Sequence, residues 1–177
     1  MYYGKILKVD IANGPGMRVT LFVSGCRNCC PGCFNKDTWD FKYGQPYTEK
    51  EEEYILSELG KDYYQGLTIL GGEPFEEENQ PAVLELIQKV RERYGKTRDI
   101  WAFTGYTLDE LYTRKHTEYT GQILSQIDCL VDGRFRMEEK DVTLRFRGSR
   151  NQRIIDMTKT KGTDVVLSEY NERRSHA

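Results

Sequence analysis

Residues 17–35 read Met17-Arg18-Val19-Thr20-Leu21-Phe22-Val23-Ser24-Gly25-Cys26-Arg27-Asn28-Cys29-Cys30-Pro31-Gly32-Cys33-Phe34-Asn35. The first seven are rich in β-branched and aromatic side chains, which favour a strand. Four of the five cysteines of the chain follow within eight residues. Functional sites in α/β proteins usually lie just beyond the carboxyl end of a strand. The stretch therefore predicts a strand that ends in a functional loop.

The cysteine spacing Cys26-x3-Cys30-x2-Cys33 supplies three thiolates. A cubic [4Fe–4S] cluster takes one thiolate on each iron, so three cysteines hold three irons. The fourth iron would remain open to an outside molecule. Since an open coordination site is typical of a metal that performs chemistry, the spacing predicts a reactive cluster.

A structural zinc site is the alternative interpretation of these cysteines. The loop also contains Cys26-x2-Cys29 and Cys30-x2-Cys33, which formally supply four ligands. Zinc sites with two such pairs normally separate them by a longer spacer. Two adjacent cysteines on one tetrahedral ion would also strain the backbone. We therefore favour the three-thiolate cluster and interpret Cys29 as a bystander.

The composition is that of an ordinary water-soluble chain. It has 177 residues, 38% of them hydrophobic and 31% charged, and a net charge of −2. This balance does not favour nucleic acid as a partner. We see neither a leader peptide at the amino end nor an apolar run long enough for a membrane span. Clustered cysteines indicate metal or redox use rather than a disulfide framework, so we expect a cytoplasmic protein.

The rest of the chain alternates predicted strands and helices. The alternation predicts an α/β fold with parallel strands and right-handed crossovers. Thr48, followed by Glu51, forms a capping-box pattern, and Gly60 ends that helix. We expect a single domain over residues 1–177, with a polar tail over about 159–177. The predicted strands are 3–11, 17–23, 67–70, 100–103, 127–131, 143–146 and 153–157, and the predicted helices are 48–60, 79–94, 107–114 and 117–125.

The motif Gly71-Gly72-Glu73-Pro74 ends the predicted strand 67–70. Paired glycines allow backbone carbonyls to approach a ligand without a Cβ in the way. Such carbonyls could accept hydrogen bonds from an ammonium group. A plain turn between a strand and a helix is the alternative interpretation.

These motifs together resemble the radical S-adenosylmethionine superfamily. Within it, the chain is similar to the activating proteins of anaerobic ribonucleoside-triphosphate reductase, over about residues 2–155. The segments that carry the resemblance are Asn13-Gly14-Pro15-Gly16-Met17-Arg18, Leu21 to Cys26, Cys30-Pro31-Gly32-Cys33-Phe34-Asn35-Lys36, Thr38-Trp39, Thr104-Gly105-Tyr106, Leu130-Val131-Asp132-Gly133, Phe146-Arg147-Gly148-Ser149 and Asn151-Gln152.

The resemblance implies a fold and a set of cofactor contacts. The fold would be a small, incomplete (β/α) barrel of parallel strands with helices outside and the cluster at the strands' carboxyl ends. Cys26, Cys30 and Cys33 would bind one [4Fe–4S] cluster. S-adenosylmethionine would be contacted by Gly32, Cys33, Phe34 and Gly72. The family often has tyrosine where Phe34 stands, so a phenolic hydrogen bond would be absent here.

The resemblance also implies an activity. An electron from a donor such as flavodoxin or ferredoxin would reach the cluster, and S-adenosylmethionine would be cleaved reductively. The resulting radical would take a hydrogen from a glycine of the large reductase subunit and leave a glycyl radical. The cofactors carry this chemistry, so we assign no catalytic side chain beyond the cluster ligands.

Three other functions remain open from the residues alone. One is an activase of pyruvate formate-lyase, a family that is usually longer and has an aromatic residue where Gly32 stands. Another is a small radical enzyme that acts on a deazapurine precursor. The third, which is not an enzyme, is a zinc-binding interaction module.

Two further features are interpreted from the sequence. Cys129 lies among apolar residues of a predicted strand, so we expect a buried packing residue. The segment 134–153 contains six arginines, at positions 134, 136, 145, 147, 150 and 153. It could contact an anionic partner, or it could be a solvated face with scattered ion pairs.

Overall fold

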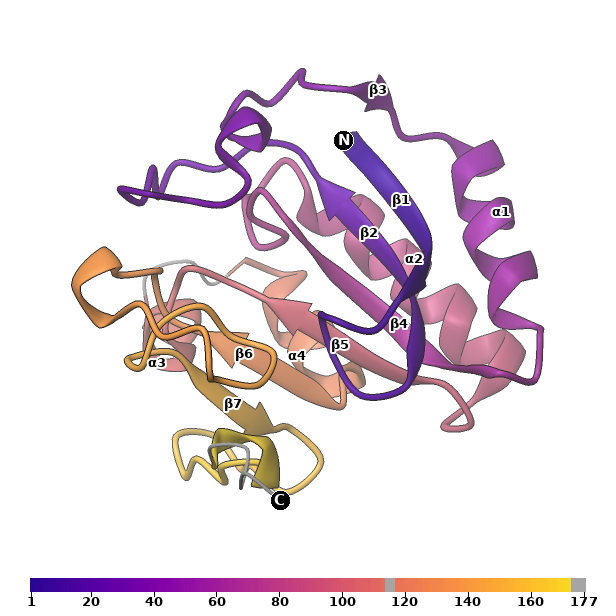
Figure 1. The fold of residues 1–177 in the computed structure, drawn as a ribbon. Coiled ribbons are helices and arrows are strands. Elements are labelled where there is room, and N and C mark those ends of the chain that lie inside the picture. Colours follow the sequence, from indigo (N-terminus) through magenta and orange to yellow (C-terminus); the bar gives the residue numbers. More distant parts are fainter. Residues whose placement is uncertain (114–116, 173–177) are drawn as a thin grey trace.

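The computed structural model describes residues 1–113 and 117–172, which are organised around one seven-stranded sheet (Figure 1). The strand order is β3-β1-β2-β4-β5-β6-β7. The strands are β1 (Tyr2–Asp10), β2 (Met17–Val23), β3 (Gln45–Pro46), β4 (Tyr64–Gly71), β5 (Asp99–Phe103), β6 (Cys129–Asp132) and β7 (Arg153–Asp156). The α-helices are α1 (Glu49–Leu59), α2 (Gln80–Tyr94), α3 (Leu108–Thr113) and α4 (Thr120–Gln126), and the short 3₁₀ helices are η1 (Lys36–Trp39), η2 (Met137–Glu139) and η3 (Glu169–Asn171).

The centre of the sheet is parallel, as the alternation of strands and helices predicts. Strands β2, β4, β5 and β6 pair in parallel. The outer pairs β1–β2, β1–β3 and β6–β7 are antiparallel, so parallel strands are confirmed for the centre and not for the edges. The connection between β1 and β2 is too short for a parallel crossover, which needs a dozen or more residues. The fold is therefore a mixed α/β sheet.

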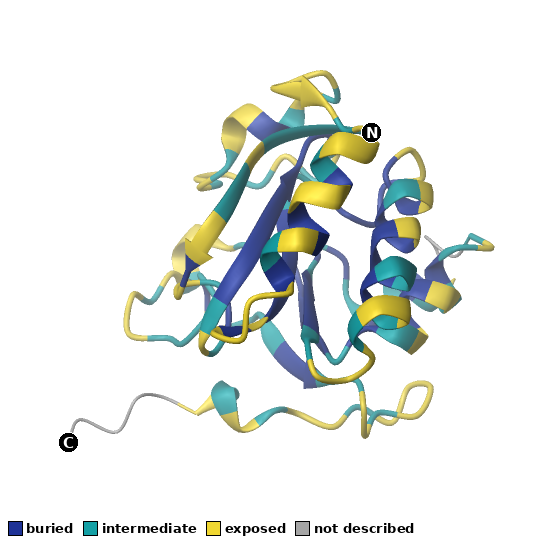
Figure 2. Ribbon diagram, turned by 90° about the vertical axis from the view of Figure 1, so that its right-hand side faces the viewer, coloured by how far each residue is buried: buried dark blue, intermediate teal, exposed yellow. Residues whose placement is uncertain are grey.

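Helices α1 and α2 pack on one face of this sheet and bury their apolar stripes against it (Figures 1 and 2). The predicted cap of α1 is confirmed, because Thr48 and Glu51 form a capping box and Gly60 is the carboxyl cap. Helix α2 spans almost the whole predicted range 79–94. No helix within residues 1–113 and 117–172 combines the length and apolar character needed to cross a bilayer.

The other sheet face carries a smaller apolar cluster. It contains Cys129, which is 5% exposed and packs with Trp101, Val131 and Ile154. This burial confirms the predicted packing role of Cys129. The rings of Phe146 and Tyr170 pack against Trp101 and tie the chain before and after β7 to this face.

The predicted strand at 143–146 and the predicted start of the helix at 117–125 need correction. The strand predicted at 143–146 is wrong, since these residues form turns and bends. The side chain of Asp141 accepts the Thr143 backbone N–H over 3.0 Å, and Phe146 has a φ of 52°. Neither feature is compatible with an extended strand there. The helix predicted at 117–125 begins later, at Thr120, and the predicted end of the 107–114 helix at Arg114 lies outside the described residues.

The loops after the four parallel strands meet at one end of the sheet. The cysteine loop follows β2, the Gly71-Gly72 turn follows β4, and the segments after Phe103 and Asp132 follow β5 and β6. Figure 1 shows the segment after β6 in orange near the purple cysteine loop. Parallel strands present their carboxyl ends at the same edge, which explains why distant segments of the chain meet here.

Candidate metal centre

The cysteine loop is fixed to its neighbours by backbone hydrogen bonds. The Gly25 N–H donates to the Thr38 carbonyl over 2.8 Å, and the Cys26 N–H donates to the Trp39 carbonyl over 3.1 Å. Gly25 has a φ of 99°, and a Cβ there would lie 2.3 Å from the ring of Phe41. Only glycine fits this conformation and this space, so the loop begins at a defined point.

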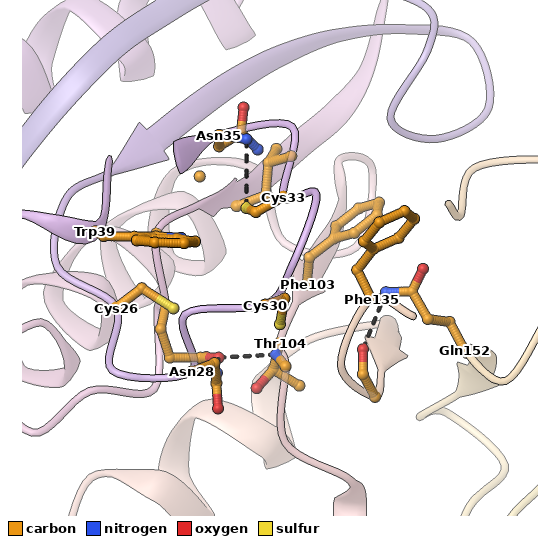
Figure 3. Close-up of a pocket in the computed structure, with 16 residues that line it drawn as sticks. Cys26, Asn28, Cys30, Cys33, Asn35, Trp39, Phe103, Thr104, Phe135 and Gln152 are labelled. Atoms are coloured by element: carbon orange, nitrogen blue, oxygen red, sulfur yellow. Dashed lines mark hydrogen bonds between the residues drawn. The ribbon is translucent and has the colours of Figure 1, made fainter. Parts of the chain in front are cut away.

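Cys26, Cys30 and Cys33 line a single pocket (Figure 3). All three are partly buried, whereas Cys29 is exposed and is not among the lining residues. The Cys33 sulfur accepts the backbone N–H of Asn35 over 3.4 Å. The pocket thus brings together the three cysteines of the x3–x2 spacing and leaves the fourth outside.

The remaining walls of the pocket come from the segment after β2, from the ends of β4 and β5 with the loops that follow them, and from the segment after β6. Figure 3 shows Trp39, Phe103 and Phe135 around the space between the cysteines. The Trp39 Nε1 is buried and has no hydrogen-bond partner in the described part of the chain. A buried N–H without an acceptor is unusual and costly, so it fits a pocket that receives an acceptor. The other lining residues are Asn28, Asn35, Leu70, Gly71, Gly72, Glu73, Thr104, Gly105, Gly133 and Gln152.

Burial determines the protonation of the pocket's titratable groups. It raises the pKa of the Cys26 thiol to about 12, and the charge of Glu73 adds to this effect. Burial also raises the pKa of Cys30. Burial raises the pKa of Glu73 to about 7, although backbone N–H groups of Gly105 and Phe75 act in the opposite direction. Because metals bind thiolates, a metal centre here must displace the thiol protons.

The donor set of the pocket suits a cluster with three protein ligands. Within residues 1–113 and 117–172, no three His, Cys, Asp or Glu side chains converge on a point that could hold one metal ion. Three thiols nevertheless surround one pocket, and a cubic cluster takes its thiolates on separate irons. The chemistry of these donors and the unpartnered indole N–H both fit such a group.

The residues predicted to contact S-adenosylmethionine lie in different places. Cys33 and Gly72 line the pocket, whereas Gly32 and Phe34 do not. Gly32 has a φ of 73°, and a Cβ there would lie 2.6 Å from the end of the Met137 side chain. Phe34 is 67% exposed, and its ring centroid lies 5.2 Å from that of Phe135.

Phe34 belongs to a second concavity, which we call the apolar groove. The groove is continuous with the pocket, because both are lined by Cys33, Asn35, Leu70, Phe103, Phe135 and Gln152. Its further lining residues are Lys5, Leu7, Asp10, Ala12, Asn13, Phe22, Phe34, Lys140, Asp141, Val142, Leu144, Phe146, Arg147 and Gly148.

Several pocket residues were not predicted from the sequence. Asn28, Thr104 and Gln152 lie within or beside the motifs that carry the family resemblance, so their position could have been inferred from those motifs. Phe135 lies in the arginine-rich segment and has no comparable sequence signal. Gln152 accepts the backbone N–H of Gly148 over 2.9 Å and donates to the Gly133 carbonyl over 3.0 Å, which closes the loop after β6.

Most arginines of segment 134–153 have partners within the protein. Arg134, Arg136 and Arg153 form ion pairs with Glu110, Glu139 and Asp132. The guanidinium of Arg147 donates to the carbonyls of Gln152 and Asn171, and that of Arg145 lies over the rings of Phe146 and Tyr170. These contacts favour a structural role for the segment.

Comparison with known proteins gives consistent matches. A family model described as a 4Fe-4S single cluster domain matches residues 12–155. The anaerobic ribonucleoside-triphosphate reductase-activating protein of Escherichia coli (strain K12) is 46% identical over 155 residues, which cover 86% of this chain and 96% of that protein. The protein of the same name from Vibrio cholerae is 43% identical over 157 residues, covering 87% and 97%. That of Enterobacteria phage T4 is 38% identical over 156 residues, covering 87% and 93%.

The mixed α/β sheet, the three-thiol pocket and the family match define an iron–sulfur protein with a single 4Fe–4S cluster domain. Within that class, the chain belongs to the family of anaerobic ribonucleoside-triphosphate reductase-activating proteins. This membership confirms the resemblance inferred from the cysteine loop and its neighbouring motifs. It also favours an iron–sulfur cluster over the zinc alternative.

Proposed function

We propose that this protein is a radical S-adenosylmethionine activase that generates a glycyl radical on the large subunit of an anaerobic ribonucleoside-triphosphate reductase. Membership in the family of activating proteins is the observation that carries the proposal. The three-thiol pocket supports it, because Cys26, Cys30 and Cys33 would bind three irons of one [4Fe–4S] cluster.

The cluster, when bound, supplies the electron that cleaves the sulfonium of S-adenosylmethionine. The protein's own residues would hold and enclose the reactants. Gly72 lines the pocket, and on this proposal its backbone would contact the methionine part of the cofactor. The Trp39 side chain lines the pocket, and its indole N–H would be a donor for a bound group that reaches it. Aromatic walls from Phe103 and Phe135 would exclude water from the reacting atoms.

The apolar groove supports a protein substrate. It leads from Cys33 past Phe34 to the exposed side chain of Val142, which is 87% accessible. A loop of another protein could lie along such a groove and place one backbone carbon near the pocket. On this proposal, Phe34 forms part of the groove side of the site, and Gly32 allows the turn of the chain just before Cys33. The sheet would then form an incomplete barrel, and its uncovered side would admit the partner.

The proposal includes a cytoplasmic location and an electron donor such as flavodoxin or ferredoxin. We expect a small iron–sulfur or flavin protein as donor because the cluster must receive one electron at a time. Dithionite can replace this donor in the laboratory, so the central test does not depend on its identity.

The test is anaerobic reconstitution with iron and sulfide, followed by mixing with the reductase large subunit, S-adenosylmethionine and dithionite. We expect an electron paramagnetic resonance doublet of a glycyl radical on the large subunit. Omission of S-adenosylmethionine is the matched control. A parallel incubation with pyruvate formate-lyase tests the rival activase. An intact cluster that yields no radical on the reductase would contradict the proposed partner.

A further inference from the structure

Residues 73–79, between β4 and α2, hold the cysteine loop through side chains spaced three residues apart. The Asn79 side-chain amide donates to the Ser24 carbonyl over 3.0 Å. The Glu73 carboxylate accepts the side-chain amide of Asn28 over 3.0 Å. Asn79 and Glu73 are at most 1% exposed, so water does not compete for these bonds. One short segment therefore fixes both the beginning and the middle of the loop.

Glu76, between these two residues, accepts hydrogen bonds from both the backbone and the side chain of Arg27 in the loop. Its Oε1 accepts the Arg27 backbone N–H over 2.9 Å, and its Oε2 accepts from the Arg27 guanidinium over 2.7 Å. The Tyr106 hydroxyl also donates to Oε1, over 3.2 Å. Glu76 is 0% exposed. Because a buried carboxylate needs such donors, its position and that of the Arg27 backbone are fixed together.

Arg27 directly follows Cys26 and begins the link to Cys30. We propose that Glu76 is a positioning residue of the metal centre: by holding the Arg27 N–H, it fixes the chain between these cysteines and hence the separation of their thiols. The inference rests on the proposed cluster site. Groups that orient metal ligands without touching the metal commonly change metal affinity by roughly 10- to 100-fold.

Glu78 provides a matched control. It binds the same Arg27 guanidinium, with an oxygen–nitrogen distance of 2.5 Å, but its side chain is 49% exposed, and both of its hydrogen bonds from Arg27 come from the guanidinium and not from the backbone N–H. Replacing Glu78 by Gln weakens an ion pair of Arg27 without changing the acceptor of its backbone N–H. A comparison of Glu76 with Glu78 therefore separates the effect of the backbone contact from that of the ion pair.

The experiment uses the reconstituted protein and the variants Glu76→Met, Glu76→Asp, Glu76→Gln and Glu78→Gln. We measure the rate at which a chelator removes the iron–sulfur absorbance, and the electron paramagnetic resonance spectrum of the reduced cluster. Met offers no acceptor and Asp is one methylene too short, so both should lose the cluster about tenfold faster, with shifted g values. Gln keeps one oxygen for the Arg27 N–H, so Glu76→Gln and Glu78→Gln should stay close to the wild type.

Circular dichroism identifies a variant that fails to fold. If Glu76→Met is unfolded, the test of the positioning role rests on Glu76→Asp, which keeps the negative charge. If the Met and Asp variants lose the cluster at the wild-type rate and give the wild-type spectrum, the role of Glu76 is wrong, but the proposed function still stands. Faster loss of the cluster with unchanged g values would also contradict the role of Glu76, because that pattern indicates a general destabilisation of the protein. A wild-type protein that assembles no cluster would overturn the proposed function together with this inference.

Discussion

Cys29 and Cys30 are adjacent in the chain, but the backbone gives them different surroundings. Cys29 has a φ of 46°, in the left-handed region, and its side chain is exposed. Cys30 lies partly buried in the pocket wall. The turn is closed by the Cys33 N–H, which donates to the Cys30 carbonyl over 3.1 Å. A single backbone conformation thus separates a proposed ligand from a bystander.

We predict that Cys30→Ala abolishes cluster binding and S-adenosylmethionine cleavage, whereas Cys29→Ser keeps the iron content of the wild type. The physical reason is that Cys30 alone of this pair lines the pocket. Iron and sulfide analysis of the reconstituted variants, with cleavage assayed by chromatography, checks both statements. Full iron content in Cys30→Ala would show that Cys29 can replace it or that the ligand assignment is wrong.

Asp128 joins three elements at the end of the sheet where β5 and β6 begin. Its carboxylate accepts hydrogen bonds from Arg91 on α2, from Lys96 after α2 and from the Ile100 backbone N–H of β5. Burial alone would raise the pKa of Asp128, but these hydrogen bonds outweigh it and the pKa lies below the ordinary value. The ionised carboxylate therefore stabilises the packing of α2 against the sheet.

We predict that Asp128→Asn lowers the free energy of unfolding at pH 7 by about 1.5–3 kcal/mol, the usual range for hydrogen bonds to a charged group. Since the folded pKa is depressed, the stabilisation is complete above the unfolded value of about 3.9 and is lost as the pH falls through the folded pKa. The difference between variant and wild type should accordingly shrink below pH 4.

Urea unfolding of the cluster-free protein at pH 7 and pH 3 measures this difference. Asp62→Asn, at an exposed position before β4, is the control and should change little at either pH. An equal loss of stability at both pH values would show that Asp128→Asn acts through packing and not through the charge.

At the scale of the whole molecule, the pocket and the apolar groove form one continuous surface. The groove combines side chains from β1, β2, β4 and β5 with the segment after β6. Phe22, Leu70 and Phe103 form its floor on the sheet, and Val142 and Leu144 belong to the segment beyond β6. The open groove is the basis for the proposed docking of a reductase segment.

We predict that Val142→Asp raises the reductase concentration needed for half-maximal radical formation by about tenfold. A tenfold change corresponds to about 1.4 kcal/mol, well below the cost of fully burying an unpaired charge, because a carboxylate at this exposed position stays partly solvated. Cluster content should be unchanged, because Val142 is 87% exposed and lies outside the cysteine pocket. Quantified glycyl radical signals at increasing reductase concentrations provide the measurement.

Val9→Asp is the control for this prediction. Val9 is 59% exposed on β1 and is not among the groove's lining residues. Both substitutions add one negative charge, so a general electrostatic effect would appear in both variants. If both variants raise the reductase concentration for half-maximal radical formation by the same factor, docking in the groove is contradicted.

The amino-acid sequence by itself determined the features that depend on neighbouring residues. The spacing of Cys26, Cys30 and Cys33 indicated a three-thiolate cluster, and the strand at 17–23 and the cap at Thr48 followed from side-chain type and local hydrogen bonding. These features can be predicted from a few consecutive residues, because strand propensity and helix capping depend on side chains that are close together in the sequence. The family resemblance rests on the same local motifs.

Only the tertiary structure decided which distant residues share the site. Phe135 and Gln152 reach the pocket because the segment after β6 folds back over the sheet, and Glu76 meets Arg27 because β2 and β4 are neighbours. The antiparallel edges and the turn at 143–146 likewise depend on chain packing and side-chain hydrogen bonds. Contacts between residues far apart in sequence arise from the burial of both faces of the sheet, and no local pattern encodes their partners.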